Sequence, residues 1–226
     1  MRKAKPTDFS MVLADYLFVF LPTQKGLSDN TIRSYSDTLE LFLRFLENER
    51  GIKRERLEIA HLSRPVVEDF LVWLEMERGS SASTRNQRRV ALNGFFRYLQ
   101  YRNPGYVLLC QQILSIPKKV GPRKNVEHIS MEAVAEILKQ PDLSTRIGRR
   151  DFALLTLLYE SAARVSEIAN LRVGDFQVDK HHGAVVRLYG KGRKVRTVPL
   201  TKSISELLQD YLRFESDLRP CSKDEP

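Results

Sequence analysis

The fold of this chain is decided by residues 149–176, RRDFALLTLLYESAARVSEIANLRVGDF, together with residues 183–200, GAVVRLYGKGRKVRTVPL. In the first segment, apolar residues recur at helical spacing and predict a helix with one apolar face, formed by Phe152, Leu155, Leu158 and Tyr159. This helix is expected to end at Ala162 and Ala163. A second short amphipathic helix is expected to follow, with Ser166 as its N-cap.

Arg164 lies between these two predicted helices. Arginine is rarely buried without a partner, and its planar fork of donors fits phosphate or carboxylate oxygens. A lone arginine beside an apolar helix therefore predicts a site for an anion. The alternative is a structural ion pair with Glu160 or Glu167.

The second segment predicts a β-hairpin. Residues 184–189 and 195–199 are rich in strand-forming residues, and a connection that contains two glycines, Gly190 to Lys194, joins them. Lys191 would lie at the tip of this hairpin, where it can approach a ligand. The alternative is a solvated loop lysine. The spacing of a nucleotide-binding P-loop is absent.

Both segments resemble the tyrosine recombinases, the group of Xer, phage-integrase and transposon-integrase proteins. Members typically read L-L-Y-x-T-G-[LA]-R-x-S-E-[LI]-x-x-L-x-x-x-D, followed by a hairpin of the form G-K-G-x-K-x-R-x-V-P-L. The matching residues here are Leu157, Leu158, Tyr159, Arg164, Ser166, Glu167, Ile168, Leu171, Asp175 and most of the run from Gly190 to Leu200. One departure is Ala162, where the family usually has glycine, and alanine in a strained turn costs only about 1 kcal/mol.

The resemblance implies a DNA recombinase or integrase that cleaves and rejoins strands through a phosphotyrosine intermediate. In that chemistry Arg164 would hold a non-bridging phosphate oxygen and Lys191 would protonate the departing 5′ oxygen. Glu167 would orient the site without reacting. The family needs neither a metal nor a nucleotide, so no cofactor is expected.

The later elements of the family pattern are not found in this chain. An H-x-x-R box, a further His or Trp and the nucleophilic tyrosine should all follow the hairpin, and none of the eight tyrosines suits the role of nucleophile. His61 to Arg64 does spell H-x-x-R, but it precedes Arg164 and is interpreted as coincidence. We therefore expect 226 residues that bind DNA but are catalytically incomplete, an amino-terminal portion of a recombinase. The alternatives are a natural non-catalytic DNA-binding relative that acts as regulator or inhibitor, and a helical repressor with an unrelated second domain.

Composition agrees with a nucleic-acid partner. The formal net charge is +9, and clustered Lys and Arg replace counterions on a phosphate backbone, so double-stranded DNA is the expected partner. A basic surface that serves solubility is the alternative. Two cysteines make no disulfide framework and fit a reducing cytoplasm. No apolar run reaches membrane-spanning length. Acidic residues interrupt the apolar amino-terminal stretch and no small-residue cleavage site follows, which favours a first amphipathic helix over a signal peptide.

The expected fold is mainly α with a small β-hairpin or sheet. A helical core-binding (SAM-like) bundle would occupy residues 1–116 and a basic, flexible linker residues 117–126. The amino-terminal part of an α+β catalytic domain would occupy residues 127–226. Helices are expected at 9–20, from the polar cluster at 28–30 to before Gly51, after Pro65, from near Ser83, and at 107–114.

Three basic or polar groups are candidates for DNA contact, at two helix starts and in the linker. Their members are Thr31, Arg33 and Ser34; Arg85, Asn86, Arg88 and Arg89; and Lys118, Lys119, Arg123 and Lys124. Spare N–H groups at a helix start favour phosphate, and the three arginines of the second group share one helical face. Solvated helix faces and an ordinary linker are the alternatives. The family resemblance implies self-association on DNA in the full-length protein.

Overall fold

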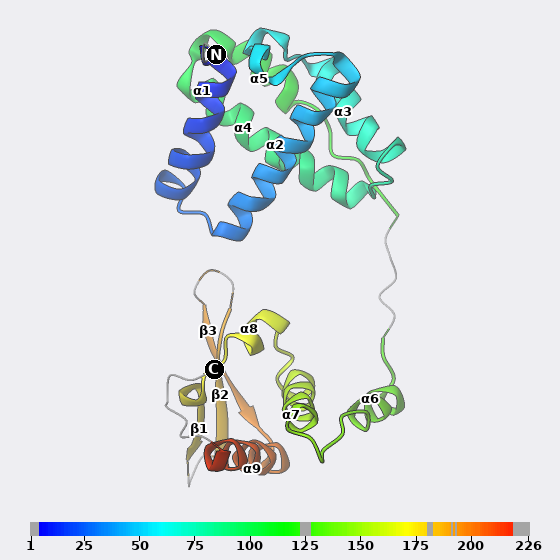
Figure 1. The fold of residues 1–226 in the computed structure, drawn as a ribbon, viewed down its shortest axis with the longest axis vertical. Coiled ribbons are helices and arrows are strands. Elements are labelled where there is room, and N and C mark those ends of the chain that lie inside the picture. Colours follow the sequence, from blue (N-terminus) through cyan, green and yellow to red (C-terminus); the bar gives the residue numbers. More distant parts are fainter. Residues whose placement is uncertain (1–4, 123–127, 180–182, 191, 193, 219–226) are drawn as a thin grey trace. The chain divides into compact units, whose positions relative to one another are not determined.

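The structure is a computed structural model that describes residues 5–122, 128–179, 183–190, 192 and 194–218. The chain forms two compact units, Met1–Asn125 and Val126–Pro226 (Figure 1). Among the described residues, every helix is too short or too polar to serve as a membrane span.

The first unit is helical throughout its described residues. Five α-helices are joined by short 3₁₀ turns, and the first runs directly into a π-helical segment. The elements are α1 (Asp8–Asp15), the π-helix η1 (Tyr16–Gln24), α2 (Asp29–Arg50), η2 (Arg54–Arg56), η3 (Ile59–His61), α3 (Arg64–Met76), α4 (Ala82–Arg102), η4 (Pro104–Tyr106) and α5 (Val107–Leu114).

Most of these helices begin and end where the local sequence signals indicate. Serine side chains at positions 63 and 81 accept N–H groups of the first turns of α3 and α4, and Gly51 ends α2 with φ of 65°. The prediction for the first helix was wrong in its second half, because α-helix gives way to π-helix at Tyr16. Pro22 lies inside this segment and lacks an N–H group for the regular helical bond.

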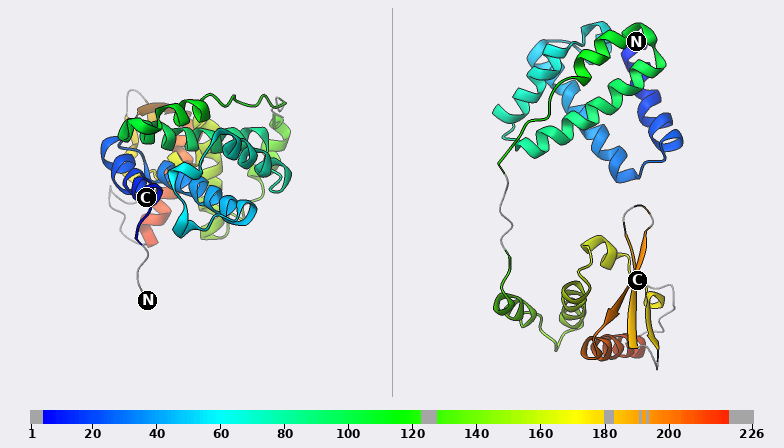
Figure 2. Two further views of the ribbon diagram at one scale, coloured as in Figure 1. Left: turned by 90° about the horizontal axis from the view of Figure 1, so that it is seen from above. Right: turned by 180° about the vertical axis from the view of Figure 1, so that it is seen from behind.

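The core of the first unit is rich in aromatic rings. α4 packs against α2, α3 and α5, so its buried face lies between them (Figures 1 and 2). Phe70 packs edge-on against Phe42, with 5.1 Å between ring centroids, and Phe95 packs in the same way against Phe9 and Tyr16. On α4, Ala91, Leu92, Phe95 and Leu99 are all buried.

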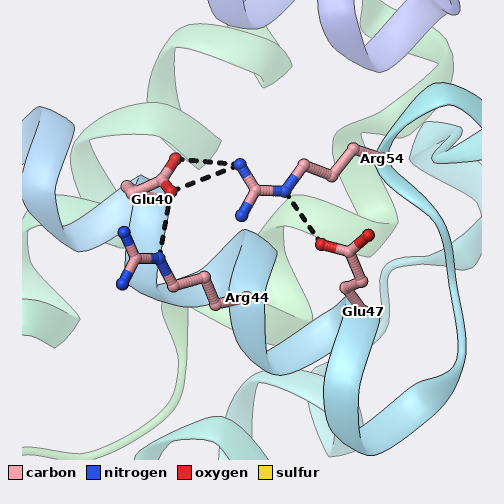
Figure 3. Close-up of polar contacts among 4 residues, drawn as sticks. All are labelled: Glu40, Arg44, Glu47 and Arg54. Atoms are coloured by element: carbon pink, nitrogen blue, oxygen red, sulfur yellow. Dashed lines mark hydrogen bonds and ion pairs between the residues drawn. The ribbon is translucent and has the colours of Figure 1, made fainter.

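An ion-pair network fixes the connection that follows α2. Arg54 of η2 reaches Glu40 and Glu47 on α2, and Glu40 also accepts from Arg44 (Figure 3). The hydrogen bond from Arg44, helped by Arg54, lowers the pKa of Glu40. All four side chains are at least 38% exposed, so solvent screening leaves the network a small contribution to stability.

The second unit combines helices with a three-stranded antiparallel sheet of order β1-β2-β3. Its elements are α6 (Met131–Leu138), α7 (Arg146–Ser161), α8 (Val165–Ala169), η5 (Val173–Asp175), β1 (Phe176–Asp179), β2 (Gly183–Tyr189), β3 (Val195–Leu200) and α9 (Lys202–Leu218). The predicted hairpin is confirmed, with Val186 opposite Val198. The short strand β1 was not predicted from sequence.

Helices α7 and α9 and the sheet bury a second core. Alternate residues of β2, Ala184, Val186 and Leu188, are buried in it together with Leu157 of α7 and Leu208 of α9. The predicted apolar face of α7 was right in part. Leu158 packs against this core, but the fully buried positions are Ala153, Thr156, Leu157 and Ser161, together with Gly148. Tyr159 is 48% exposed, because only one narrow stripe of α7 meets the sheet and α9.

Candidate functional site

Arg164 is held by the turn that joins α7 to α8. α7 ends at Ser161, and Ala162 takes the left-handed conformation with φ of 47° and ψ of 35°. Arg164, and not Ser166, is the N-cap of α8, so the prediction about Ser166 was wrong. The physical reason is that the Glu167 carboxylate accepts the Arg164 N–H at 2.9 Å, so the helix starts two residues earlier than expected.

Two arginines share the carboxylate of Glu167. Arg164 Nη1 donates to Oε1 at 2.8 Å. Arg196, on β3, donates from Nη1 to Oε1 at 3.0 Å and from Nη2 to Oε2 at 2.8 Å. These hydrogen bonds lower the pKa of Glu167 to about 2. The bonds from the Arg196 side chain have the largest effect, and the bond from the Arg164 backbone N–H has the next largest. Glu167 is therefore ionised at neutral pH although only 2% of its side chain is exposed.

The base of the hairpin meets the same carboxylate. A Cβ added to Gly190 would lie 3.0 Å from Glu167 Oε1 and 3.8 Å from Arg164 Nη1, so a side chain at this position would crowd both groups. The Gly190 N–H donates to the Lys194 carbonyl at 2.7 Å and closes the base of the loop. Lys191, the predicted proton donor, lies outside the described residues.

The charges at this position favour an anion. One carboxylate faces two guanidinium groups, so the cluster carries a net positive charge. The Arg164 side chain is 67% exposed, which leaves much of its donor fork open to solvent. Within the described part of the chain, no group of three His, Cys, Asp or Glu residues could hold a metal ion.

The four predicted DNA-contact residues of α4 reach three different parts of the first unit. Arg85 lies 3.4 Å from Glu75 of α3, and its side chain is only 12% exposed. Arg88 donates to the Ser34 carbonyl and to the Thr38 hydroxyl of α2. Arg89 donates to the segment that follows α5, so each of the three arginines has its partner on a different neighbouring segment. The three side chains therefore do not form one solvent-exposed basic surface.

The other two residues of this group, Asn86 and Arg89, hold residues 116–121, which we call the strap. Asn86 exchanges two hydrogen bonds with the Lys119 backbone, at 2.8 and 2.9 Å. Arg89 donates to the Ile116 carbonyl at 2.6 Å, and a Cβ added to Gly121 would lie 2.8 Å from the Ala82 Cβ. The strap therefore lies along the first half of α4 and is not a free linker, contrary to the prediction for this part of 117–126.

The two described lysines of the strap differ in whether they have a partner within the protein. Lys119 pairs with Glu75 at 2.8 Å, whereas Lys118 is exposed. Arg123 and Lys124 lie outside the described residues.

At the start of α2, the predicted residues adjoin those of α4. Thr31 and Ser28 hydroxyls lie 3.0 Å apart, and Ser34 accepts from Gln87 and from Arg88. Arg33 is exposed. The structure thus brings the two helix starts and the strap together, while several of their cations are already engaged within the protein.

The excess positive charge lies in the first unit. Residues 1–125 hold 21 Lys and Arg against 13 Asp and Glu, and residues 126–226 hold 16 against 15, so the units carry +8 and +1. A polyanion would therefore be attracted mainly to the first unit, and the second unit offers a local anion site at Arg164.

Comparison with known proteins places both units in one family. Residues 15–103 match the model of the phage integrase N-terminal SAM-like domain, and residues 124–223 match that of the phage integrase family. The putative integrase/recombinase y4rD of Sinorhizobium fredii is 30% identical over 201 residues, which cover 89% of this chain and 71% of that protein. The chain belongs to the tyrosine recombinase family.

Two further relatives show how much of a tyrosine recombinase the chain spans. The putative integrase/recombinase y4rC of S. fredii is 34% identical over 209 residues, 92% of this chain and 62% of that protein. The crystal structure of XerH site-specific recombinase bound to palindromic difH substrate, a post-cleavage complex, matches with a TM-score of 0.65 at 25% identity. That match covers 85% of this chain and 55% of XerH. The chain thus spans about three-fifths of the length of these recombinases.

Sequence reasoning missed Arg196 as a member of the site. The signal was present, because the family hairpin pattern includes an arginine at this position. His61, in the apparent H-x-x-R run, lies in the first unit, where its Nδ1 accepts the Glu58 N–H. Arg64 pairs with Glu68 within α3. Both residues therefore have local structural partners.

Proposed function

We propose that these residues form the DNA-binding portion of a site-specific recombinase or integrase, with double-stranded DNA as partner. The observation that carries the proposal is the exposed Arg164 guanidinium, fixed by a buried Glu167 in a tyrosine recombinase fold. Family membership supports strand cleavage and rejoining as the reaction class. The named XerH structure supports DNA as partner, since that recombinase is bound to a DNA substrate.

In this proposal Arg164 holds a non-bridging oxygen of the scissile phosphate. A planar fork can donate two parallel bonds to a phosphate, and the fixed charge stabilises the negative charge that develops in the transition state. Glu167 orients Arg164 through the Arg164 backbone N–H, which its carboxylate accepts at 2.9 Å. Lys191, on the loop that follows Gly190, protonates the departing 5′ oxygen. No cofactor takes part in these steps.

The first unit supplies most of the affinity for the duplex backbone. Its charge of +8 supports this assignment, as does the gathering of the helix starts of α2 and α4 with the strap. Arg33 and Lys118 are exposed and are proposed to contact phosphates directly. Arg85, Arg88 and Arg89 are proposed to act indirectly, by holding α3, α2 and the strap against α4.

The 226 residues alone are proposed to bind without cleaving, because nothing in them is assigned as the attacking tyrosine. Tyr159, which adjoins the site in sequence, donates its hydroxyl to Met131 Sδ at 2.9 Å. The test begins with duplexes selected from random DNA by this chain. A nicked suicide form of the selected duplex should give a shifted complex and no covalent adduct resistant to denaturant. An adduct that disappears on one Tyr→Phe substitution would prove a nucleophile inside the chain.

The role of Arg164 has its own test on the same duplex. Each phosphate is replaced in turn by a neutral methylphosphonate, and affinity is measured for the wild type and for Arg164→Ala. One position should weaken wild-type binding about tenfold and leave the variant unchanged, since a hydrogen bond between charged groups has been lost. Equal profiles for both proteins would contradict the assignment of Arg164 to a phosphate.

A further inference from the structure

A bound phosphate would compete with Glu167 for the Arg164 guanidinium. Arg164 now uses Nη1 to bond Glu167 Oε1 at 2.8 Å. A phosphate that accepts two parallel bonds from this planar fork, one of them from Nη1, would draw the group away from the carboxylate. The Glu167 side chain is 2% exposed, so water cannot replace the lost partner, and an unpaired buried carboxylate is strongly unfavourable.

Arg196 keeps the buried Glu167 carboxylate from being left without a charged partner. It donates to both oxygens of Glu167, at 3.0 and 2.8 Å, so the carboxylate keeps a two-bond charged partner when the Arg164 side chain turns away. The Arg164 N–H also stays on Oε2, which keeps the backbone of the site in place. Arg196 is 40% exposed and lies on β3, opposite Leu188 of β2, so it can hold Glu167 without itself leaving the strand.

We propose that Arg196 is a positioning residue that permits Arg164 to exchange Glu167 for an anion. This inference rests on the proposed function, because it assumes that Arg164 binds a phosphate. A second effect follows from the same two bonds. They join β3 to α8, and Gly190 lets the end of β2 approach the carboxylate closely, so the two strands of the hairpin are held beside Arg164.

The test uses inorganic phosphate as probe and the whole 226-residue chain. Phosphate binding is followed from the rise in unfolding temperature with phosphate concentration, at constant ionic strength set with chloride. The part of the response that Arg164→Ala abolishes defines binding at the site. Arg196→Met should weaken this part about tenfold or more, because Arg164 is then the only arginine left to pair with Glu167.

A double variant separates this role from a purely structural one. Glu167→Gln keeps a side-chain oxygen for the Arg164 N–H and removes the charge that needs a partner. Adding Glu167→Gln to Arg196→Met should therefore restore phosphate binding to within about threefold of the wild type. Arg187→Met is the matched control, since Arg187 is an exposed arginine on the neighbouring strand, and its phosphate response should equal that of the wild type.

Each outcome decides a different claim. If Arg164→Ala binds phosphate as the wild type does, the proposed role of Arg164 fails, and the inference about Arg196 fails with it. If Arg164→Ala loses the response but Arg196→Met keeps it, or if the double variant stays as weak as Arg196→Met, only the inference about Arg196 is overturned. If Arg196→Met does not fold, Arg196→Lys gives the same comparison, because lysine keeps the charge and loses the two-bond fork. Arg196→Lys should weaken phosphate binding, and adding Glu167→Gln to Arg196→Lys should restore it.

Discussion

Replacing Ala162 by glycine should stabilise the second unit. Ala162 is the one described non-glycine residue with positive φ, at 47°, and it ends α7 in the left-handed conformation. Its side chain is exposed, so the substitution removes no packing. Glycine takes this conformation without the contact between Cβ and carbonyl that penalises alanine.

The size of the effect is the difference between two terms. The left-handed conformation costs an L-residue about 1–2 kcal/mol, and glycine loses about 0.4–1 kcal/mol through the greater freedom of the unfolded chain. At the midpoints of these two ranges, the net gain in the free energy of unfolding is about 0.8 kcal/mol. For a domain of this size, that gain corresponds to roughly 3–6 °C in unfolding temperature.

Scanning calorimetry of the full chain can separate the two units. The single tryptophan, Trp73, lies in α3, so its fluorescence identifies the transition of the first unit, which should not move. The transition of the second unit should move up in Ala162→Gly. Ala163→Gly is the matched control, because Ala163 does not have positive φ and packs against the second core. Ala163→Gly should lower the free energy of unfolding of the second unit by about 0.5–1 kcal/mol.

A neutral or destabilising result for Ala162→Gly would refute this reasoning. It would mean that the turn before Arg164 either does not hold the left-handed conformation in solution or is compensated elsewhere in the unit. Equal shifts for Ala162→Gly and Ala163→Gly would do the same, because the argument depends on the sign of φ at one position.

Three further outcomes are expected. Asn86→Ala should release the strap and speed trypsin cleavage after Lys119 several-fold in a time course, with no change in far-ultraviolet circular dichroism, because two hydrogen bonds to the Lys119 backbone are lost; an unchanged rate would mean that these bonds do not hold the strap. The pKa of Glu167 is lowered from 4.5 to about 2, so its carboxylate stabilises the fold above pH 4.5 and this contribution is lost as the pH falls toward 2. Glu167→Gln should flatten the dependence of unfolding temperature on pH in that window, and a curve parallel to wild type would count against the paired carboxylate. Burial raises the pKa of Cys110 to about 11, so in a Cys221→Ser background a disulfide reagent at pH 8 should label Cys110 only after urea is added; prompt labelling of the folded chain would show that the thiol is accessible.

The sequence determined the elements that depend on local signals. Serine caps, Gly51 and the run at 107–114 predicted helices of the first unit closely, because capping and periodicity act within a few residues. The hairpin followed from its glycine-containing connection in the same way. Two motif blocks in the right order identified the family and singled out Arg164 and Glu167.

Tertiary structure decided which of the charged residues face solvent and which hold the protein together. Arg85, Arg88 and Arg89 look alike in the sequence, yet each contacts a different segment, because the partners lie on α3, α2 and the strap, far away along the chain. The same reason hid the strap, whose Pro, Gly and Lys residues are typical of a free linker until Asn86 is placed beside Lys119. Arg196 and Glu167 are 29 residues apart in sequence, so only the packing of β3 on α8 could show that one carboxylate serves two arginines.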